Sequence, residues 1–186
     1  DNIIVVSGSQ QGLDLISRVF LDPGDVVVVE EPSYILALNV FKLRRVRFVA
    51  IPVDDKGMKV EMLEDIIREY SREGMRIKLV YTMPIAQNPT GTTMRDERRK
   101  HLLELVERYN FVIVEDDAYG LLTFEEETPK PIASIDKSGN VIYLSSFSKI
   151  LAPGLRIGHI IASDDEVAKK MHIMKQFMDL GTSTLS

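Results

Sequence analysis

The sequence predicts an α/β fold in which a mostly parallel, seven-stranded sheet lies between two layers of helices. Short apolar runs alternate with longer amphipathic segments along all 186 residues, and this order is typical of a parallel sheet with crossover helices. Several runs are continuous and rich in β-branched residues, as expected for strands that are covered on both faces. No repeat and no linker divides the chain, so we expect a single domain over residues 1–186.

The strands are expected at the apolar runs, most of which consist largely of valine and isoleucine. Seven runs meet this description: Ile3–Val6, Val26–Glu30, Arg47–Ile51, Ile77–Tyr81, Phe111–Glu115, Val141–Leu144 and Ile157–Ile161.

The helices are expected between these runs. Two segments, 60–73 and 94–110, carry apolar stripes at helical spacing. The stripes are Leu63, Ile66, Ile67 and Tyr70 in the first, and Leu102, Leu103, Val106 and Tyr109 in the second. A third helix is expected over 164–180, with Ser163 or Asp164 as its N-cap. We expect the segment Glu125–Pro131 to be an exposed loop.

Composition limits the classes of protein that are possible. With 45% hydrophobic and 27% charged residues, the chain is typical of a soluble globular protein. It contains no apolar stretch near the roughly 18 residues that span a bilayer and no signal peptide, so we predict a cytoplasmic protein without a membrane partner. The absence of cysteine excludes disulfides and thiolate metal sites. A net charge of −5 argues against nucleic-acid binding. The histidines show no metal-ligand spacing, so no metal is expected: His101, His159 and His172.

Lys149 lies in a segment that suits a phosphorylated aldehyde. It follows the apolar run Val141–Leu144 and the hydroxyl-rich turn Ser145–Ser148, and it precedes Arg156. A lysine can form a Schiff base with an aldehyde, whereas hydroxyls and a guanidinium bind phosphate. The alternative is a simple strand–turn connection with a solvated lysine and a structural arginine.

Three further motifs precede this segment. Val5–Gly12 is a strand that runs into a glycine- and serine-rich helix start, where backbone N–H groups can bind an anion. Asn88-Pro-Thr-Gly91 has the chemistry of a turn. Glu115-Asp-Asp-Ala-Tyr119 ends a buried run, at the edge where open α/β sheets bind ligands. Each motif has an ordinary explanation by itself, and their order along the chain carries the argument.

Taken together, these motifs resemble those of the fold-type I aminotransferases of class I/II, which depend on pyridoxal phosphate. The matching elements are Ser-x-Ser-Lys-x-x-x-Pro-Gly-x-Arg-x-Gly at 146–158, Asn-Pro-Thr-Gly at 88–91 and Asp-x-Ala-Tyr at 116–119. The resemblance covers essentially the whole chain and implies the large domain of the aspartate aminotransferase-like fold. Gly-Ser-Gln-Gln-Gly at 8–12 and Glu-Asp-Asp-x-Tyr-Gly at 115–120 are similar to the branch that contains 2-aminoadipate, kynurenine and aromatic aminotransferases.

The resemblance implies the catalytic roles. Lys149 would form the Schiff base with pyridoxal phosphate and then move the proton between the substrate Cα and the cofactor. Asp116 would pair with the ring nitrogen and keep it protonated. Glu115 and Asp117 are alternatives for that role, although the register of the motif favours Asp116.

The resemblance also implies the binding residues. Tyr119, the third residue predicted to be catalytic, and Asn88 would donate hydrogen bonds to the 3-oxygen of the ring. Tyr34 would stack on the ring, and Tyr34 and Asn88 would also contact the substrate. The phosphate would be bound by Ser146, Ser148 and Arg156 and by the backbone groups of Gly8, Ser9 and Gln10. The alternatives are a core tyrosine for Tyr34 and Tyr119, a turn former for Asn88, and a turn-shaping role for Ser148.

The predicted activity is the transfer of an amino group between an α-amino acid and a 2-oxo acid. A pyridoxal-phosphate lyase and an effector-sensing domain of a transcription regulator are the alternatives, because one scaffold can serve several functions. Members of the family carry an N-terminal arm and a C-terminal small domain around this domain, and they form homodimers. We expect both parts to lie outside residues 1–186, and the chain alone to transaminate weakly or not at all.

Overall fold

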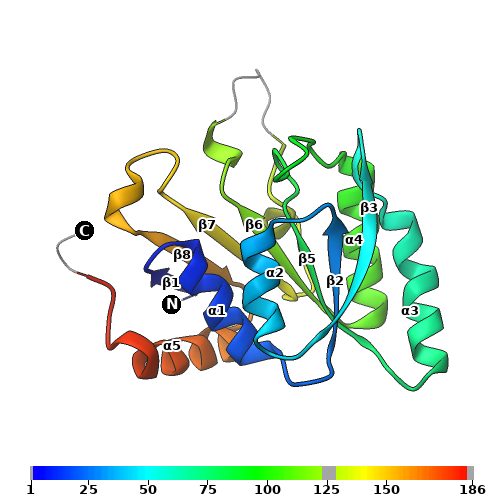
Figure 1. Ribbon diagram of the computed structural model, residues 1–186, viewed down its shortest axis with the longest axis horizontal. Coiled ribbons are helices and arrows are strands. Elements are labelled where there is room, and N and C mark those ends of the chain that lie inside the picture. Colours follow the sequence, from blue (N-terminus) through cyan, green and yellow to red (C-terminus); the bar gives the residue numbers. More distant parts are fainter. Residues whose placement is uncertain (1, 123–128, 184–186) are drawn as a thin grey trace.

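The computed structural model describes residues 2–122 and 129–183, which form one sheet with helices packed against it (Figure 1). The sheet has eight strands in the order β1-β8-β7-β6-β5-β2-β3-β4. Their bounds are β1 Ile3–Val6, β2 Val26–Glu31, β3 Arg47–Asp54, β4 Gly57–Met58, β5 Ile77–Thr82, β6 Val112–Asp117, β7 Val141–Ser146 and β8 Gly158–Ala162.

The sheet is mixed but mostly parallel, as predicted. Strands β3, β2, β5, β6 and β7 run parallel to one another. Strand β8 is antiparallel to both β7 and β1. The seven predicted strands are all present, and the eighth, β4, pairs antiparallel with the end of β3. This strand is only two residues long, too short to show any periodicity in the sequence.

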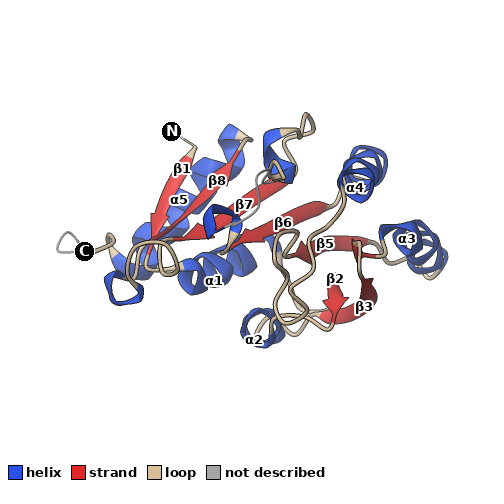
Figure 2. Cartoon of the chain, turned by 90° about the horizontal axis from the view of Figure 1, so that it is seen from above, coloured by secondary structure: helices blue, strands red, loops and turns tan. Residues whose placement is uncertain are grey.

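The helices cover both faces of the sheet, which confirms the three-layer prediction. One core cluster joins the sheet to α1, α2 and α5, and a second joins it to α3 and α4. Figure 2 shows the sheet passing between α1 and α2 on one side and α4 on the other. The bounds are α1 Ser9–Phe20, α2 Ile35–Lys42, α3 Leu63–Arg72, α4 Asp96–Tyr109 and α5 Asp165–Asp179.

The helix ends follow from local chemistry. Helix α5 is N-capped by Asp164, whose side chain accepts a hydrogen bond from the Val167 N–H at 2.9 Å. Helix α4 has acidic residues in its first turn and ends at Asn110, which adopts the left-handed conformation with φ 53°. The segment predicted as one helix from residue 60 begins as the 3-10 turn Val60–Met62 before α3.

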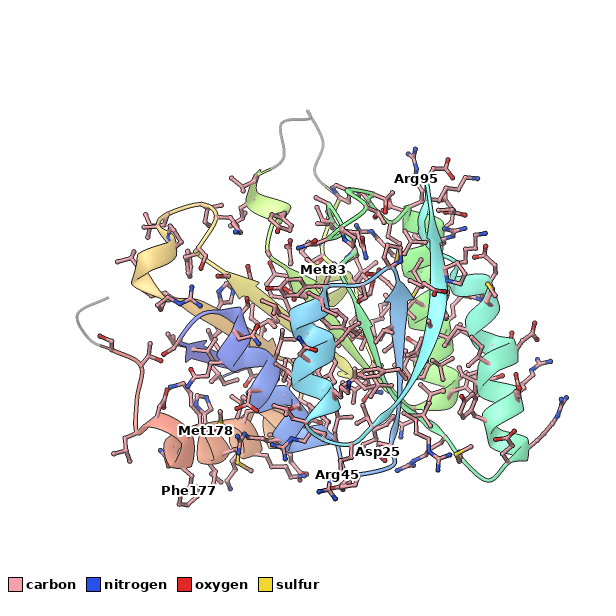
Figure 3. The ribbon with its side chains drawn as sticks, in the orientation of Figure 1. Asp25, Arg45, Met83, Arg95, Phe177 and Met178 are labelled. Carbon is pink, nitrogen blue, oxygen red and sulfur yellow. The ribbon has the colours of Figure 1, made fainter. Side chains whose placement is uncertain are left out.

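Several motif segments meet at one edge of the sheet, because the carboxyl ends of parallel strands lie together. Val6 at the end of β1 and Ser146 at the end of β7 both pair with Gly158, the first residue of β8. In Figure 3 this edge is at the top, marked by Met83, whereas Asp25 and Arg45 lie at the opposite edge. The turns after β1, β5 and β7 and the end of β6 therefore border the same space.

The loop predicted at Glu125–Pro131 lies outside the described residues as far as position 128. Pro129 to Pro131 lead into the short 3-10 turn Ile132–Ser134. Across residues 2–122 and 129–183, no helix is both long enough and apolar enough to cross a membrane.

Candidate functional site

The turn after β1 and the side chain of Arg156 form a basic cradle. Gly8 has φ 75° and precedes the first residue of α1. The guanidinium of Arg156 lies so close to Gly8 that a Cβ at this position would overlap its Nη2 atom. Because the first N–H groups of a helix lack intrahelical partners, those at the start of α1 are available to an anion. The Arg156 guanidinium and the free N–H groups at the start of α1 therefore lie together, where they can bind one anion.

Hydroxyl groups complete this cradle. Arg156 Nη1 donates to Ser148 Oγ at 3.2 Å, and Ser146 Oγ donates to Ser148 Oγ at 2.9 Å. Gly158 keeps the cradle compact, since a Cβ there would lie 2.7 Å from the Ser145 carbonyl and 3.0 Å from the Ser9 nitrogen. The structure thus brings together five of the six predicted phosphate residues: Gly8, Ser9, Ser146, Ser148 and Arg156. The sixth, Gln10, lies in the first turn of α1, where its backbone N–H is one of the groups at the helix start, and its side chain is exposed.

Two of the three acids at the end of β6 are already hydrogen-bonded to neighbouring segments of the protein. Glu115 accepts hydrogen bonds at 2.8 Å from two backbone N–H groups of the Ile132–Ser134 turn. Asp117 accepts from the Gly120 N–H at 2.7 Å and from the Tyr143 hydroxyl at 2.8 Å. Both carboxylates therefore stabilise the chain that follows β6 and the neighbouring strand.

Asp116 differs from its neighbours because one of its oxygens is not used. The Tyr81 hydroxyl donates to Oδ2 at 2.8 Å, whereas Oδ1 is buried and has no hydrogen-bond partner among the described residues. Burial raises the pKa of Asp116 to about 6, against the effect of the Tyr81 hydrogen bond. A ligand N–H placed at Oδ1 would satisfy this oxygen and stabilise the carboxylate. The geometry favours Asp116 over Glu115 and Asp117 for binding a ring nitrogen.

Tyr34 and Tyr119 lie near Asp116. Tyr34 is the N-cap residue of α2 and is half-buried. Burial raises its pKa, and the charges of Asp116 and Tyr119 raise it further, which places the three groups within electrostatic range. Both tyrosines pack against the core on one side and keep part of their surface exposed. They therefore have the core contacts that the sequence left open and keep a surface for the predicted binding role.

Lys149 and Asn88 lie on the same edge. Lys149 is in the turn directly after β7, with an exposed side chain, and Asn88 is half-buried in the loop after β5. Both positions therefore lie at the carboxyl edge of the sheet, beyond the ends of β7 and β5. Within the described ranges, no group of three or more His, Asp or Glu side chains is placed to hold a metal ion.

The sequence prediction gave no role to several buried polar residues, among them Glu30, Gln87 and Arg99. Arg99 is 1% exposed and donates to the carbonyl oxygens of Met94, Lys130 and Pro84, each at 2.8 Å. It therefore joins the loop after β5 to the segment after position 129. The sequence does contain a sign that Glu30 is buried, since it directly follows a run of four valines. Arg99 gave no signal, since α4 carries many charged residues and only the fold shows which one is buried.

Comparison with known proteins agrees with this geometry. The sequence model of the family described as aminotransferase class I and II matches residues 1–186. The chain belongs to this family. Aromatic-amino-acid aminotransferase 1 of Thermococcus litoralis is 53% identical over 185 residues, which cover 100% of this chain and 44% of that enzyme. The family predicted from the motifs is therefore confirmed.

Similarity in structure supports the same family, and similarity in sequence also extends to a regulator. A crystal structure of Pyrococcus horikoshii kynurenine aminotransferase, in complex with PMP and substrates, matches 97% of this chain and 44% of that one, with a TM-score of 0.94 and 52% identity. An uncharacterised HTH-type transcriptional regulator of Bacillus subtilis, YisV, is 40% identical over 99% of this chain and 37% of its own length. The chain spans less than half the length of these relatives.

Proposed function

We propose that the protein is a pyridoxal-phosphate-dependent aminotransferase that moves an amino group from an α-amino acid to a 2-oxo acid. The observation that carries the proposal is the buried Oδ1 of Asp116, which lacks a partner among the described residues, on the same sheet edge as the basic cradle around Arg156. An unpaired buried carboxylate oxygen is costly, and a protonated ring nitrogen satisfies it. The residues thus fit a cofactor that has a ring nitrogen at one end and a phosphate at the other.

The residues that would hold the cofactor follow from their places. Arg156, Ser146, Ser148 and the N–H groups at the start of α1 would bind the phosphate. Asp116 would accept the ring N–H, and Tyr34 would pack on the ring face. Asn88 and Tyr119 would donate hydrogen bonds to the ring oxygen. Tyr34 and Asn88 would also contact the substrate.

Bound pyridoxal phosphate supplies an aldehyde that takes up the amino group and a ring that withdraws electrons from the substrate Cα. Lys149 is the amine that would hold the aldehyde. Once the substrate amine has replaced it, Nζ would take the proton from Cα and return it next to the ring. Asp116 would keep the ring nitrogen protonated throughout. In the second half-reaction a 2-oxo acid accepts the amino group, which restores the starting state.

The test is an absorbance spectrum of the purified protein with pyridoxal phosphate. We expect a band near the visible edge that is lost in Lys149→Ala and kept in Lys169→Ala, which removes an exposed lysine of α5. An amino acid should abolish the band and a 2-oxo acid should restore it. A band that survives in Lys149→Ala would contradict the role of Lys149. In a longer polypeptide that contains this chain, a stable band that no amino acid changes would contradict transamination.

The similarity to an HTH-type regulator makes an effector-sensing domain the second candidate. Amino-group transfer between an amino acid and a 2-oxo acid favours the enzyme. Specific DNA binding by a polypeptide that contains this chain, without turnover, favours the regulator. A lyase on the same scaffold would release a fragment of its substrate instead of a 2-oxo acid.

We further propose a homodimer and a cytoplasmic location. Exposed apolar side chains on β1, Ile3 at 52% and Val5 at 49% exposure, support association with a further surface. Sedimentation over a range of concentrations tests the first proposal, and cell fractionation tests the second.

A further inference from the structure

Glu30 is a buried carboxylate at the end of β2 that takes no part in the chemistry proposed above. Its side chain is 2% exposed and accepts three hydrogen bonds. The donors are the Thr82 hydroxyl at 2.6 Å, the Met83 N–H at 3.2 Å and the Gln87 side-chain amide at 3.1 Å. Met83 lies at the carboxyl edge of the sheet (Figure 3). One side chain therefore joins the end of β2 to the end of β5 and to the loop that follows.

Gln87 extends these contacts to two segments of the site. Its Nε2 atom also donates to the Pro32 carbonyl at 2.7 Å, two residues before Tyr34. Its Oε1 atom accepts from the N–H and the hydroxyl of Thr90, at 2.9 and 2.8 Å, and so closes the turn that contains Asn88. The pair of Glu30 and Gln87 therefore holds the segments that carry Tyr34 and Asn88.

We propose that Glu30 is a positioning residue that acts through Gln87 to hold Tyr34 and Asn88 in their places at the site. That these two residues face a cofactor rests on the proposed function, whereas the contacts of Glu30 do not. Glu30 acts on the site only through Gln87 and the ends of the two strands, since its three donors are Thr82, Met83 and Gln87.

The chemistry of the three contacts requires an acceptor at position 30. An ionised carboxylate only accepts hydrogen bonds, and bonds to a charged group are the strong ones. Glu30→Met removes both oxygens and leaves three buried donors unpaired, which is costly. Glu30→Gln keeps one oxygen for the Met83 and Gln87 donors, and the Thr82 hydroxyl can turn to accept from the new amide. The glutamine variant should therefore rescue the positioning.

Ionisation of Glu30 should loosen this arrangement. Burial raises its pKa to about 7, the three hydrogen bonds oppose this shift, and the charge of Asp116 adds to it. Asp116 on β6 and Tyr81 on β5 are the titratable groups whose charges act on Glu30. A protonated Glu30 keeps one acceptor oxygen and can donate to the Thr82 hydroxyl, as a glutamine would. Because opening exposes the carboxyl to water and lowers its pKa, we expect the two segments to open more readily at pH 8 than at pH 6, and Glu30→Gln to remove this difference.

The first arm of the test is hydrogen–deuterium exchange at pH 8 without cofactor. In Glu30→Met we expect exchange to be about 10-fold faster in peptides covering 34–38 and 83–92, as for the loss of one hydrogen bond to a charged group. In Glu30→Gln it should stay within about threefold of the unsubstituted protein. The matched control is Glu115→Met, which removes another buried carboxylate with a pKa raised by burial to about 7 but whose donors lie at Ile132 and Ala133.

The second arm is the Kd for pyridoxal phosphate, measured by absorbance titration. We expect Glu30→Met to raise it about tenfold more than Glu115→Met does, and Glu30→Gln to restore it. Unchanged exchange at 34–38 and 83–92 in Glu30→Met overturns the inference. Faster exchange with a Kd equal to that of Glu115→Met overturns its cofactor part. If the unsubstituted protein binds no pyridoxal phosphate, the proposed function fails, whereas the exchange result still decides whether Glu30 holds the two segments.

Discussion

At the scale of single residues, the site depends on positions where only one side chain is compatible with its surroundings. Gly8 shows this most clearly, because its backbone has a positive φ and the Arg156 guanidinium occupies the volume of a side chain. Two separate requirements therefore exclude any other residue there. A comparison with a glycine that meets only one of them can separate the two effects.

We predict that Gly8→Ala destabilises the protein by about 2 kcal/mol more than Gly24→Ala. Both glycines have positive φ, 75° and 94°, but a Cβ at Gly24 has no atom within 4 Å. Both variants lose roughly 1–2 kcal/mol to backbone strain, and only the first must also displace Arg156. Urea unfolding measures the difference. Equal losses in the two variants would show that Arg156 moves aside without cost.

Asp116→Asn should affect stability and cofactor binding in opposite directions. At pH 8 the substitution removes a buried charge whose pKa is raised to about 6, so the cofactor-free protein should unfold at a higher temperature. It also removes the carboxylate that would bind the ring N–H, so the Kd for pyridoxal phosphate should rise at least about tenfold. Calorimetry and absorbance titration measure the two effects. Unchanged cofactor affinity would exclude Asp116 as the partner of the ring nitrogen.

The sequence could locate the acids on β6 but could not separate them by their surroundings. Glu115 and Asp117 differ from Asp116 because they bind the Ile132–Ser134 turn and Tyr143, and these partners lie beyond the motif along the chain. The role of Glu30 was equally hidden, since its partners are more than 50 residues away. Short motifs predict which residue types gather at an edge, whereas the tertiary fold determines which oxygen is left unpaired.

At the scale of elements, the loops of the site are held by buried charged side chains rather than by apolar packing. Arg99 on α4 binds three carbonyl groups, which lie 5, 15 and 31 residues away along the chain. We predict that Arg99→Met destabilises the protein by about 3 kcal/mol, because the three carbonyl oxygens lose their donors. Chemical denaturation measures this loss.

The control for this prediction is Arg108→Met on the same helix. Arg108 pairs with Glu64 at 2.9 Å, but 58% of its side chain is exposed, and exposed ion pairs contribute less than about 1 kcal/mol. A loss as small in Arg99→Met as in Arg108→Met would show that the loops hold without the buried guanidinium.

Elements with a clear periodicity were predicted to within a few residues, and the differences have physical causes. Strand β6 continues through Asp116 and Asp117 because tertiary partners satisfy these acids, whereas the sequence suggested that the strand ends before them. The bounds of α2 were not predicted, since Ile35–Lys42 is apolar over most of its surface and shows no stripe.

At the scale of the whole molecule, buried acids make stability depend on pH. Burial raises the pKa of Glu30 and Glu115 to about 7 in the folded state. A raised folded pKa gives stability that is present below the unfolded pKa, near 4.5, and is lost as pH rises through the folded pKa. We therefore expect the free energy of unfolding of the cofactor-free protein to fall between about pH 5 and pH 8.

Glu115→Gln should reduce this fall by about 2–3 kcal/mol, since the substituted group no longer titrates. The measurement is urea unfolding at several pH values across this range. Asp54, whose pKa the Arg98 guanidinium lowers, contributes in the opposite sense and only in acid, so it does not interfere above pH 5. An equal fall in the variant would mean that Glu115 is solvated in the folded state.

The outer edge of the sheet predicts association. Strand β1 lies at the edge and exposes Ile3 and Val5, and an exposed apolar edge strand pairs readily with another surface. We expect the protein to self-associate at high concentration and Val5→Lys to shift this equilibrium at least about tenfold toward monomer. Analytical ultracentrifugation measures the shift. Leu43→Lys, at a separate position that is 77% exposed, is the control and should leave the equilibrium unchanged.

The pairing of β1 with β8 has a consequence for synthesis on the ribosome. Val6 on β1 pairs with Gly158 on β8. Strand β1 therefore has no neighbour in the sheet until β8 has been synthesised. At roughly 5–20 residues per second, roughly 150 residues take about 8–30 s to translate. During that time the Gly8 turn exists without Arg156, and the parallel strands can already pair with one another. The nascent chain thus acquires its anion cradle after the framework that will hold it.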